Sequence, residues 1–261
     1  MGAIDISIYS LWMAFLLLLI PVVICLKYKV PLVSALFVST LRMSIQLVLI
    51  GIYLKYLFVW NNTLLNIAWL IVMILVAIVT VTKQSALRTT KVIIPVFGSF
   101  FFATFSILLF LNVCVIRLDN MFDARYLIVL GGMMLGNSLR GTIIGVTSFY
   151  NTIKKDKKAY LYTLALGASQ KEALLPYLRQ SIELALKPSL ATMATMGIVA
   201  LPGMMTGVIL GGTAPDVAIK YQIMIMLAII TSTVLSVVLT IILTIKTCFT
   251  SYGTLAEDVF A

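Results

Sequence analysis

The sequence contains no histidine and little negative charge. None of its 261 residues is His, and only nine are Asp or Glu. A Ser-His or Cys-His catalytic pair is therefore excluded, and so is an aspartyl pair inside a membrane, because the apolar stretches carry no acid in their interiors. No G-x-x-x-x-G-K-[ST] sequence is present, so the chain supplies no P-loop for ATP. We expect a non-enzymatic chain without a metal site or cofactor of its own.

Cysteine is also scarce. Cys25, Cys114 and Cys248 lie in or at the ends of apolar stretches, without paired spacing. Such residues behave as small buried hydrophobes rather than as a disulfide framework or a metal site.

Long apolar runs dominate what is present. Hydrophobic residues make up 62% of the chain, charged residues 11%, and the mean hydropathy is +1.12, which is more apolar side chain than a soluble core buries. A membrane-spanning helix needs about 20 apolar residues. Seven stretches qualify: residues 7–26, 32–54, 64–82, 93–116, 126–149, 190–210 and 221–245. We predict an all-α polytopic membrane protein of about seven transmembrane helices, forming one domain over residues 1–261.

The basic residues predict the orientation. The first, third and fifth loops hold 12 Lys or Arg residues, whereas the even loops hold 4. Since positive loops stay cytoplasmic, we expect an outside N-terminus and a cytoplasmic C-terminus in a plasma or inner membrane. The first stretch has no basic region before it, so we expect a retained helix rather than a signal peptide. The net charge of +10 is then an orientation signal and does not indicate nucleic-acid binding.

Residues 150–189 differ from the other loops, because they mix many charges with an amphipathic pattern. Leu175, Leu178, Ile182 and Leu186 recur at steps of three and four, as on one face of a helix. Gly167 and Ser169 predict a turn followed by a helix N-cap, and Pro176 predicts a bend that separates a short helix from a longer one. The segment is either a cytoplasmic coupling element or an interfacial helix lying on the headgroups.

Polar residues inside the spans are candidates for a substrate pathway. Arg42, with Gln46 one turn later on the same face, and Arg140, with nearby Asn137, lie at membrane depth, where charge is costly. Each arginine either ties helices together or lines a cavity. Asn137 needs a polar partner, across a subunit interface or in the pathway. The surrounding glycines of the fifth span favour close helix packing.

The sharpest local signal is Leu201 to Gly207. Pro202 removes a backbone donor, and Gly203 and Gly207 loosen the helix. A helix broken at membrane depth either lines a substrate route or is a packing kink. Met204 and Met205 follow; thioethers bind soft metals, but methionine in a span is more often a packing residue.

Several motifs together resemble the FetB-like family of ABC permeases. The coupling-helix pattern of such permeases matches Leu164-Ala165-Leu166-Gly167-Ala168-Ser169-Gln170-Lys171-Glu172-Ala173. The family pattern also matches Leu201-Pro202-Gly203-Met204-Met205-Thr206-Gly207, Ile219-Lys220-Tyr221-Gln222-Ile223-Met224, Arg42 with Ile45-Gln46-Leu47, and Gly136-Asn137. Two positions differ from the family pattern. Tyr162 stands where most relatives carry a glutamate, and Arg140 where they carry smaller or neutral residues.

The resemblance implies a permease subunit of an ATP-driven exporter of iron or another metal. It implies a homodimer docked on separate ATPase subunits that bind ATP and Mg²⁺, with alternating access driven by the ATPases. The pathway residues would be Arg42, Gln46, Asn137, Arg140, Pro202, Gly203, Met204, Met205 and Gly207. The coupling residues would be Tyr162, Gly167, Ala168, Ser169, Glu172 and Pro176.

Three alternatives stay open. In the first, the chain is an ABC permease whose cargo is a non-metal compound, such as a sugar nucleotide or an amphipathic molecule, as the plant aluminium-tolerance relatives of the family suggest. In the second, the chain is a membrane receptor or an assembly factor without transport, which needs no broken helix. A secondary transporter is disfavoured, because neither intramembrane carboxylates nor an internal repeat is evident.

Overall fold

The computed structural model describes residues 5–85, 89–250 and 253–256, and the side chains of residues 89–91 are not described. These residues are almost entirely helical, with no strand beyond two isolated bridges. The helices are α1 (Ile8–Phe15), α2 (Leu19–Lys27), α3 (Val33–Trp60), α4 (Thr63–Gln84), α5 (Thr89–Phe110), α6 (Ala124–Lys155), α7 (Lys157–Ala165), α8 (Gln170–Thr195), α9 (Gly203–Leu210) and α10 (Pro215–Cys248), with a 3₁₀ turn η1 (Leu16–Leu18) and a π-helical turn η2 (Leu111–Val115).

Six helical segments of the described chain are long and apolar enough to cross a membrane: Ile8–Lys27, Val33–Trp60, Thr63–Gln84, Val92–Val115, Ala124–Lys155 and Pro215–Cys248. They correspond to six of the seven predicted stretches. The chain is thus a polytopic all-α membrane protein, as its composition predicts.

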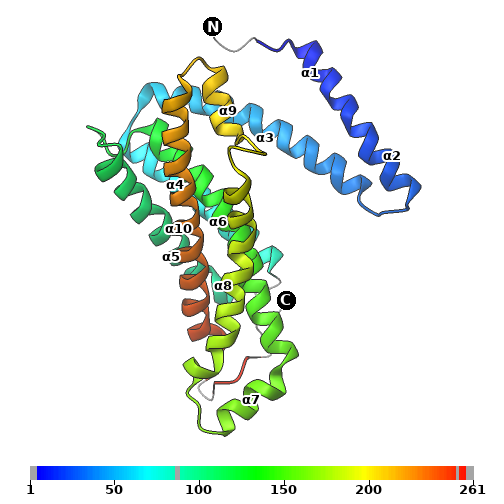
Figure 1. Cartoon of the computed structure of the whole chain (residues 1–261), viewed down its shortest axis with the longest axis vertical. Helices are drawn as coiled ribbons and strands as arrows, with labels where there is room; N and C mark the ends of the chain where they lie inside the picture. Colours follow the sequence, from blue (N-terminus) through cyan, green and yellow to red (C-terminus); the bar gives the residue numbers. More distant parts are fainter. Residues whose placement is uncertain (1–4, 86–88, 251–252, 257–261) are drawn as a thin grey trace.

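The remaining predicted stretch, residues 190–210, does not form one helix. Its first part is the end of α8 and its last part is α9, and residues 196–202 between them are not helical. The two helices follow one another along the long axis of the bundle (Figure 1). The interruption predicted around Pro202 therefore exists, but it precedes Gly203 instead of including Gly207.

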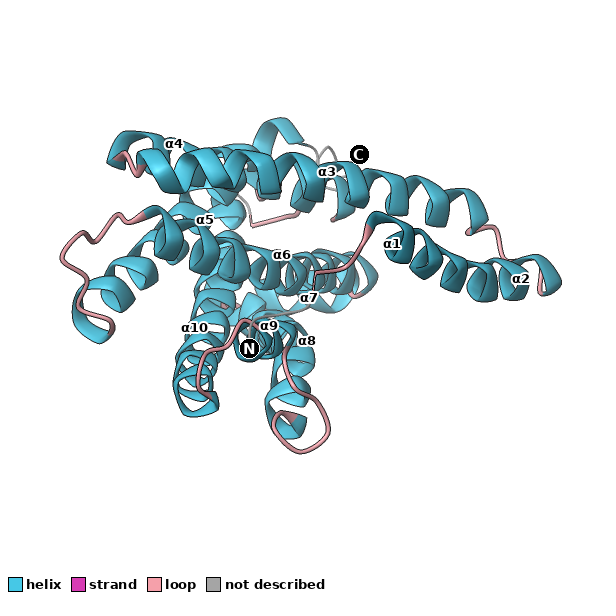
Figure 2. Cartoon of the chain, turned by 90° about the horizontal axis from the view of Figure 1, so that it is seen from above, coloured by secondary structure: helices cyan, strands magenta, loops and turns pink. Residues whose placement is uncertain are grey.

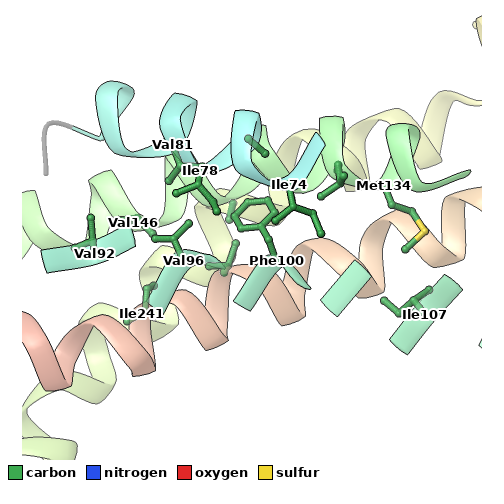
Figure 3. Close-up of a cluster of buried hydrophobic side chains, with 14 of the residues drawn as sticks. Ile74, Ile78, Val81, Val92, Val96, Phe100, Ile107, Met134, Val146 and Ile241 are labelled. Atoms are coloured by element: carbon green, nitrogen blue, oxygen red, sulfur yellow. The ribbon is translucent and has the colours of Figure 1, made fainter. Parts of the chain in front are cut away.

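The bundle is built around α6 and α10. Helix α10 packs against α5, α6 and α8, and α6 also contacts α4 and α8. Figure 3 shows the core between these helices, where Ile74, Phe100, Val146 and Ile241 are almost completely buried. Because lipid is as apolar as these side chains, close packing rather than escape from water holds the helices together.

Glycines of α6 allow this close approach. A Cβ atom on Gly141 would collide with Thr233 Cγ2, and one on Gly145 would lie 2.8 Å from Val237 Cγ1 and 3.3 Å from Ala185 Cβ. Ser138 Oγ and Ser232 Oγ share a hydrogen bond of 2.9 Å across the same α6–α10 contact. These glycines therefore serve helix packing, as their spacing predicts.

The buried face of α8 differs from the predicted stripe. Its buried residues are Ala173, Leu174, Ser181 and Ala185, whereas Leu175 is 41% exposed. The Ala185 side chain and the Ser181 backbone carbonyl lie against Gly145 of α6, so small residues occupy this close contact. Leu178 and Ile182 of the predicted stripe are half-buried against the core. Helix α8 packs on α6 and α10 and is therefore part of the helix bundle.

Helix α8 also runs straight through Pro176 and Pro188. The prediction that Pro176 separates two helices is therefore wrong. The packing of α8 against two neighbouring helices stabilises helical geometry on both sides of the missing backbone hydrogen bond.

Helices α1 to α3 form an arm that projects from the bundle (Figures 1 and 2). No residue of α1 or α2 is buried, and Leu57 is the only buried residue of α3. The end of α3 is fixed to the bundle by a polar cluster. Asn61 Nδ2 donates to Asp123 Oδ2 (2.8 Å), and the buried Asn66 Nδ2 donates to the Phe122 carbonyl (2.8 Å). The second and fourth loops therefore lie together at one end of the molecule.

Candidate functional site

The turn between α7 and α8 forms an exposed corner at the end of the bundle opposite α9 (Figure 1). We call residues 157–176 the coupling corner. Gly167 adopts φ +93°, a backbone conformation that glycine tolerates and other residues rarely adopt. The sharp turn predicted at Gly167 is thus present.

A capping box fixes the start of α8. Ser169 Oγ accepts from the backbone N–H of Glu172 (3.3 Å), while Glu172 Oε2 accepts from the Ser169 N–H (2.8 Å) and hydroxyl (2.7 Å). The N-cap predicted at Ser169 is confirmed. The hydrogen bonds from the Ser169 side chain and backbone lower the pKa of Glu172 from its ordinary value. The corner is therefore locally ordered without help from another chain.

Two large side chains stand out on the corner. Tyr162 is 67% exposed and Leu166 is 71% exposed, although both lie outside the apolar spans. Ala168 is half-buried, and Pro176 is exposed one turn into α8. The corner is therefore an ordered turn that exposes large apolar side chains outside the candidate spans, a feature typical of interaction surfaces.

The predicted pathway residues of α3 lie on the arm. Arg42 and Gln46 are both exposed and line a shallow groove along one face of α3. Among the described residues, none makes a hydrogen bond or an ion pair with Arg42. Gln46 also lies at a larger groove of about 810 Å³ between α3, α4 and α6, which Tyr53, Trp69 and Gly136 help to line.

Two of the predicted pathway residues, Asn137 and Arg140, belong to α6. Asn137 Nδ2 donates to the carbonyl of Met133, one turn earlier in the same helix (2.8 Å). Its amide nitrogen is therefore satisfied locally and makes no helix-crossing bond in one copy of the chain. Arg140 is exposed.

The α8–α9 break is a short loop at residues 196–202. Gly197 has φ +87°, and its N–H donates to the Ala200 carbonyl (2.9 Å). Pro202 is the N-cap of α9, which contains Gly203, Met204, Met205 and Gly207. Ile198 and Val199 at the tip are 92% and 80% exposed.

Four residues outside the predicted pathway and coupling sets, Gln222, Arg125, Tyr126 and Tyr221, lie near the break or near α9. Gln222 of α10 is 7% exposed, and its Nε2 lies 3.8 Å from the Met196 sulfur. Met204 lines a small pocket of about 200 Å³ with Arg125, Tyr126 and Tyr221. Gln222 could have been found from the sequence, because it is a polar residue inside the last predicted apolar stretch.

The candidate site residues therefore lie in separate parts of the molecule. Gln46 shares a groove with α6, the break contacts α10, and the corner lies at the far end. The groove beside Gln46 and the pocket beside Met204 have no lining residue in common.

Comparison with known proteins identifies a family to which the chain is similar. The model of "Uncharacterised protein family (UPF0014)" matches residues 8–249. Protein ALUMINUM SENSITIVE 3 of Arabidopsis thaliana is 30% identical over 215 residues, which cover 82% of this chain and 77% of that protein. The probable iron export permease protein FetB of Escherichia coli K12 is 31% identical over 226 residues (86% and 85%).

The UPF0014 membrane protein YjkA of Bacillus subtilis is 27% identical over 224 residues, covering 83% of this chain and 85% of that protein. No solved structure matches the chain.

Proposed function

Because the chain belongs to the UPF0014 family of membrane proteins, we propose that it is the membrane-spanning permease subunit of an ABC transporter. A separate ATPase chain would bind ATP and Mg²⁺, and the permease would alternate between two access states in a plasma or inner membrane. The similarity to a probable iron export permease supports export as the direction and iron or another metal as the cargo.

The observation that carries this proposal is the coupling corner. Tyr162 and Leu166 project from an ordered turn at the end where α7 and the C-terminal segment lie, and this end has the cytoplasmic basic residues. Lys158 and Lys171 flank the two apolar side chains. A cleft with an apolar floor and an acidic rim would complement this surface. Tyr162 would then replace the acidic contact of the relatives by aromatic packing.

The cargo would cross with its own ligands or water. The chain has no histidine, and within the described residues no three His, Cys, Asp or Glu side chains gather at one place. A bare iron ion would find no oxygen or nitrogen set to replace its hydration shell. The apolar groove beside Gln46 favours an amphipathic metal complex or an amphipathic non-metal compound as a second candidate cargo.

We also propose that two copies assemble. The arm exposes apolar side chains on every face of α1 and α2, and Arg42 would face lipid near the membrane centre at a cost of roughly 3 kcal/mol or more. A second copy lying against the arm would offer acceptors to Arg42 and shelter it from lipid.

The test is co-purification of the chain with an untagged ATPase, followed by ATP hydrolysis in reconstituted membranes. Gly167→Val should keep expression and insertion but weaken ATPase binding or uncouple hydrolysis, because a β-branched residue is strained at φ +93°. The matched control is Gly51→Ala, within α3, where an added Cβ meets nothing within 4 Å.

Wild-type ATPase binding and stimulation in Gly167→Val would show that the corner is not the coupling element. Failure of the unmodified chain to retain any ATPase would overturn the transporter proposal itself.

A further inference from the structure

The chain turns back on itself after α10. Thr250 N–H donates to the Thr254 carbonyl (2.8 Å), and Ala256 N–H donates to the Cys248 carbonyl (3.0 Å). Phe249 and Leu255 form an isolated antiparallel bridge, and Gly253 adopts φ +74° within the turn. We call residues 249, 250 and 253–256 the C-terminal hook.

The hook lies against the coupling corner (Figure 1, red segment beside α7). The Tyr160 hydroxyl donates to the Gly253 carbonyl at 2.6 Å. A Cβ on Gly253 would lie 3.5 Å from Leu164 Cδ1 and 3.8 Å from Gln170 Cγ. Gly253 therefore sits in the angle between the end of α7 and the first residue of α8.

Aromatic side chains connect the hook and α7 to the helices of the bundle. Phe249 lies 6.3 Å from Tyr160 and 6.4 Å from Tyr150 of α6, measured between ring centroids. Tyr160 also meets Tyr177 of α8 edge-on at 6.3 Å. One ring cluster thus joins α6, α7, α8 and the hook, and such ring pairs are favourable in tilted and edge-to-face arrangements.

Tyr160 is the single buried residue of α7, at 2% exposure. A nine-residue helix has little stability of its own, so its place depends on that side chain and on the groups around it. Burial raises the pKa of the Tyr160 phenol, which keeps its hydroxyl protonated and donating at neutral pH.

We propose that the C-terminal hook ties the coupling corner to α10, the last span, with Tyr160 as the positioning residue. A shift of the lower end of α10 then moves the corner with it, and a force on the corner reaches α10. Because α10 packs against α5, α6 and α8, this contact gives the corner a direct mechanical route into the centre of the bundle. The consequence for transport rests on the proposed ABC function, whereas the attachment itself does not.

The attachment is tested by hydrogen exchange on the purified full-length chain. Tyr160→Phe removes the hydroxyl and keeps the ring, so amides of residues 157–166 should exchange roughly two- to tenfold faster, the range of one net hydrogen bond. Gly253→Val, strained at its positive φ, should do the same from the hook side. Tyr28→Phe, at a residue that is 70% exposed outside the bundle, should change nothing there.

Exchange of α7 at the wild-type rate in both Tyr160→Phe and Gly253→Val would overturn the proposal. Coupling is measured separately, as transport per ATP hydrolysed. Tyr160→Phe should retain the ATPase on purification but lower that ratio, and an unchanged ratio would contradict the coupling role. If the unmodified chain binds no ATPase, the proposed function fails while the exchange experiment still decides the attachment.

Discussion

Single residues determine the shape of the coupling corner. Gly167 supplies the left-handed turn, and Ser169 with Glu172 satisfies the first backbone donors of α8. Each of these groups acts locally, within three residues of its partner. They hold the turn in place within a single copy of the chain, so in the proposed complex with an ATPase little ordering entropy would be lost on binding.

The capping box at the start of α8 leads us to expect that its stability changes with mutation of Ser169 and with pH. Ser169→Ala should destabilise the start of α8 by about 1 kcal/mol, the usual cost of losing a serine N-cap, while leaving the spans intact. The Glu172 carboxylate has a lowered pKa, so its stabilising contribution is present above the ordinary glutamate pKa and is lost as the pH falls through the lowered value.

Hydrogen exchange of the amides in residues 169–174, measured at neutral and acid pH, checks both effects. Faster exchange is expected in Ser169→Ala at neutral pH and in the unmodified chain only at acid pH. An acid-insensitive wild-type cap would contradict the role of Glu172. The control is Thr163→Ala, at an exposed residue of α7 whose hydroxyl donates only to the Ala159 carbonyl of the same helix.

At the scale of elements, the predicted stretch at residues 190–210 is divided between two helices, α8 and α9. The break at residues 196–202 turns at Gly197 and is closed by hydrogen bonds among Thr195, Gly197 and Ala200. Pro202 then starts α9, a position where a missing N–H costs nothing. The two prolines within α8 do not interrupt it, because neighbouring helices support that segment.

Gly197 is the residue on which the break depends. Gly197→Val should destabilise the protein by about 1–3 kcal/mol, because a non-glycine residue is strained at φ +87°. We expect normal membrane insertion with a lower thermal unfolding temperature in detergent, and reduced transport if the break lines the pathway. Gly51→Ala, in a helical position without close neighbours, should be neutral or slightly stabilising. Equal unfolding temperatures for Gly197→Val and wild type would show that the turn is not fixed.

At the scale of the whole molecule, the loops sort to two ends. Asn61, Asn66 and Asp123 join the second and fourth loops at one end, and Tyr160 with Gly253 joins α7 to the C-terminal hook at the other. The charge distribution predicts that the second end is cytoplasmic.

Accessibility of single cysteines tests this assignment. In a background without Cys25, Cys114 and Cys248, Asp119→Cys should react with a membrane-impermeant thiol reagent on intact cells, and Lys158→Cys only after permeabilisation. Both positions are exposed. Asn61 is a poorer site for a label because its amide holds the polar cluster together. The reverse labelling pattern would overturn the orientation.

The sequence by itself determined the helical class, six of the seven predicted spans, the turn at Gly167, the Ser169 N-cap and an interruption near Pro202. These features depend on composition, on runs of about 20 apolar residues and on chemistry between residues close in the chain. The coupling segment was recognisable for the same reason, because Gly167, Ser169 and Glu172 are near neighbours.

Only the tertiary structure decided where packing overrides local preference. Pro176 predicts a helix break, yet α8 continues because α6 and α10 support it. Ser181 and Ala185 of α8 are buried against Gly145, because the glycines of α6 let the two helices approach so closely that only small residues fit between them. The contact of Tyr160 with Gly253 and the approach of Gln222 to Met196 join residues 93 and 26 positions apart. Such pairs follow from how the helices assemble, which periodicity and local propensity do not encode.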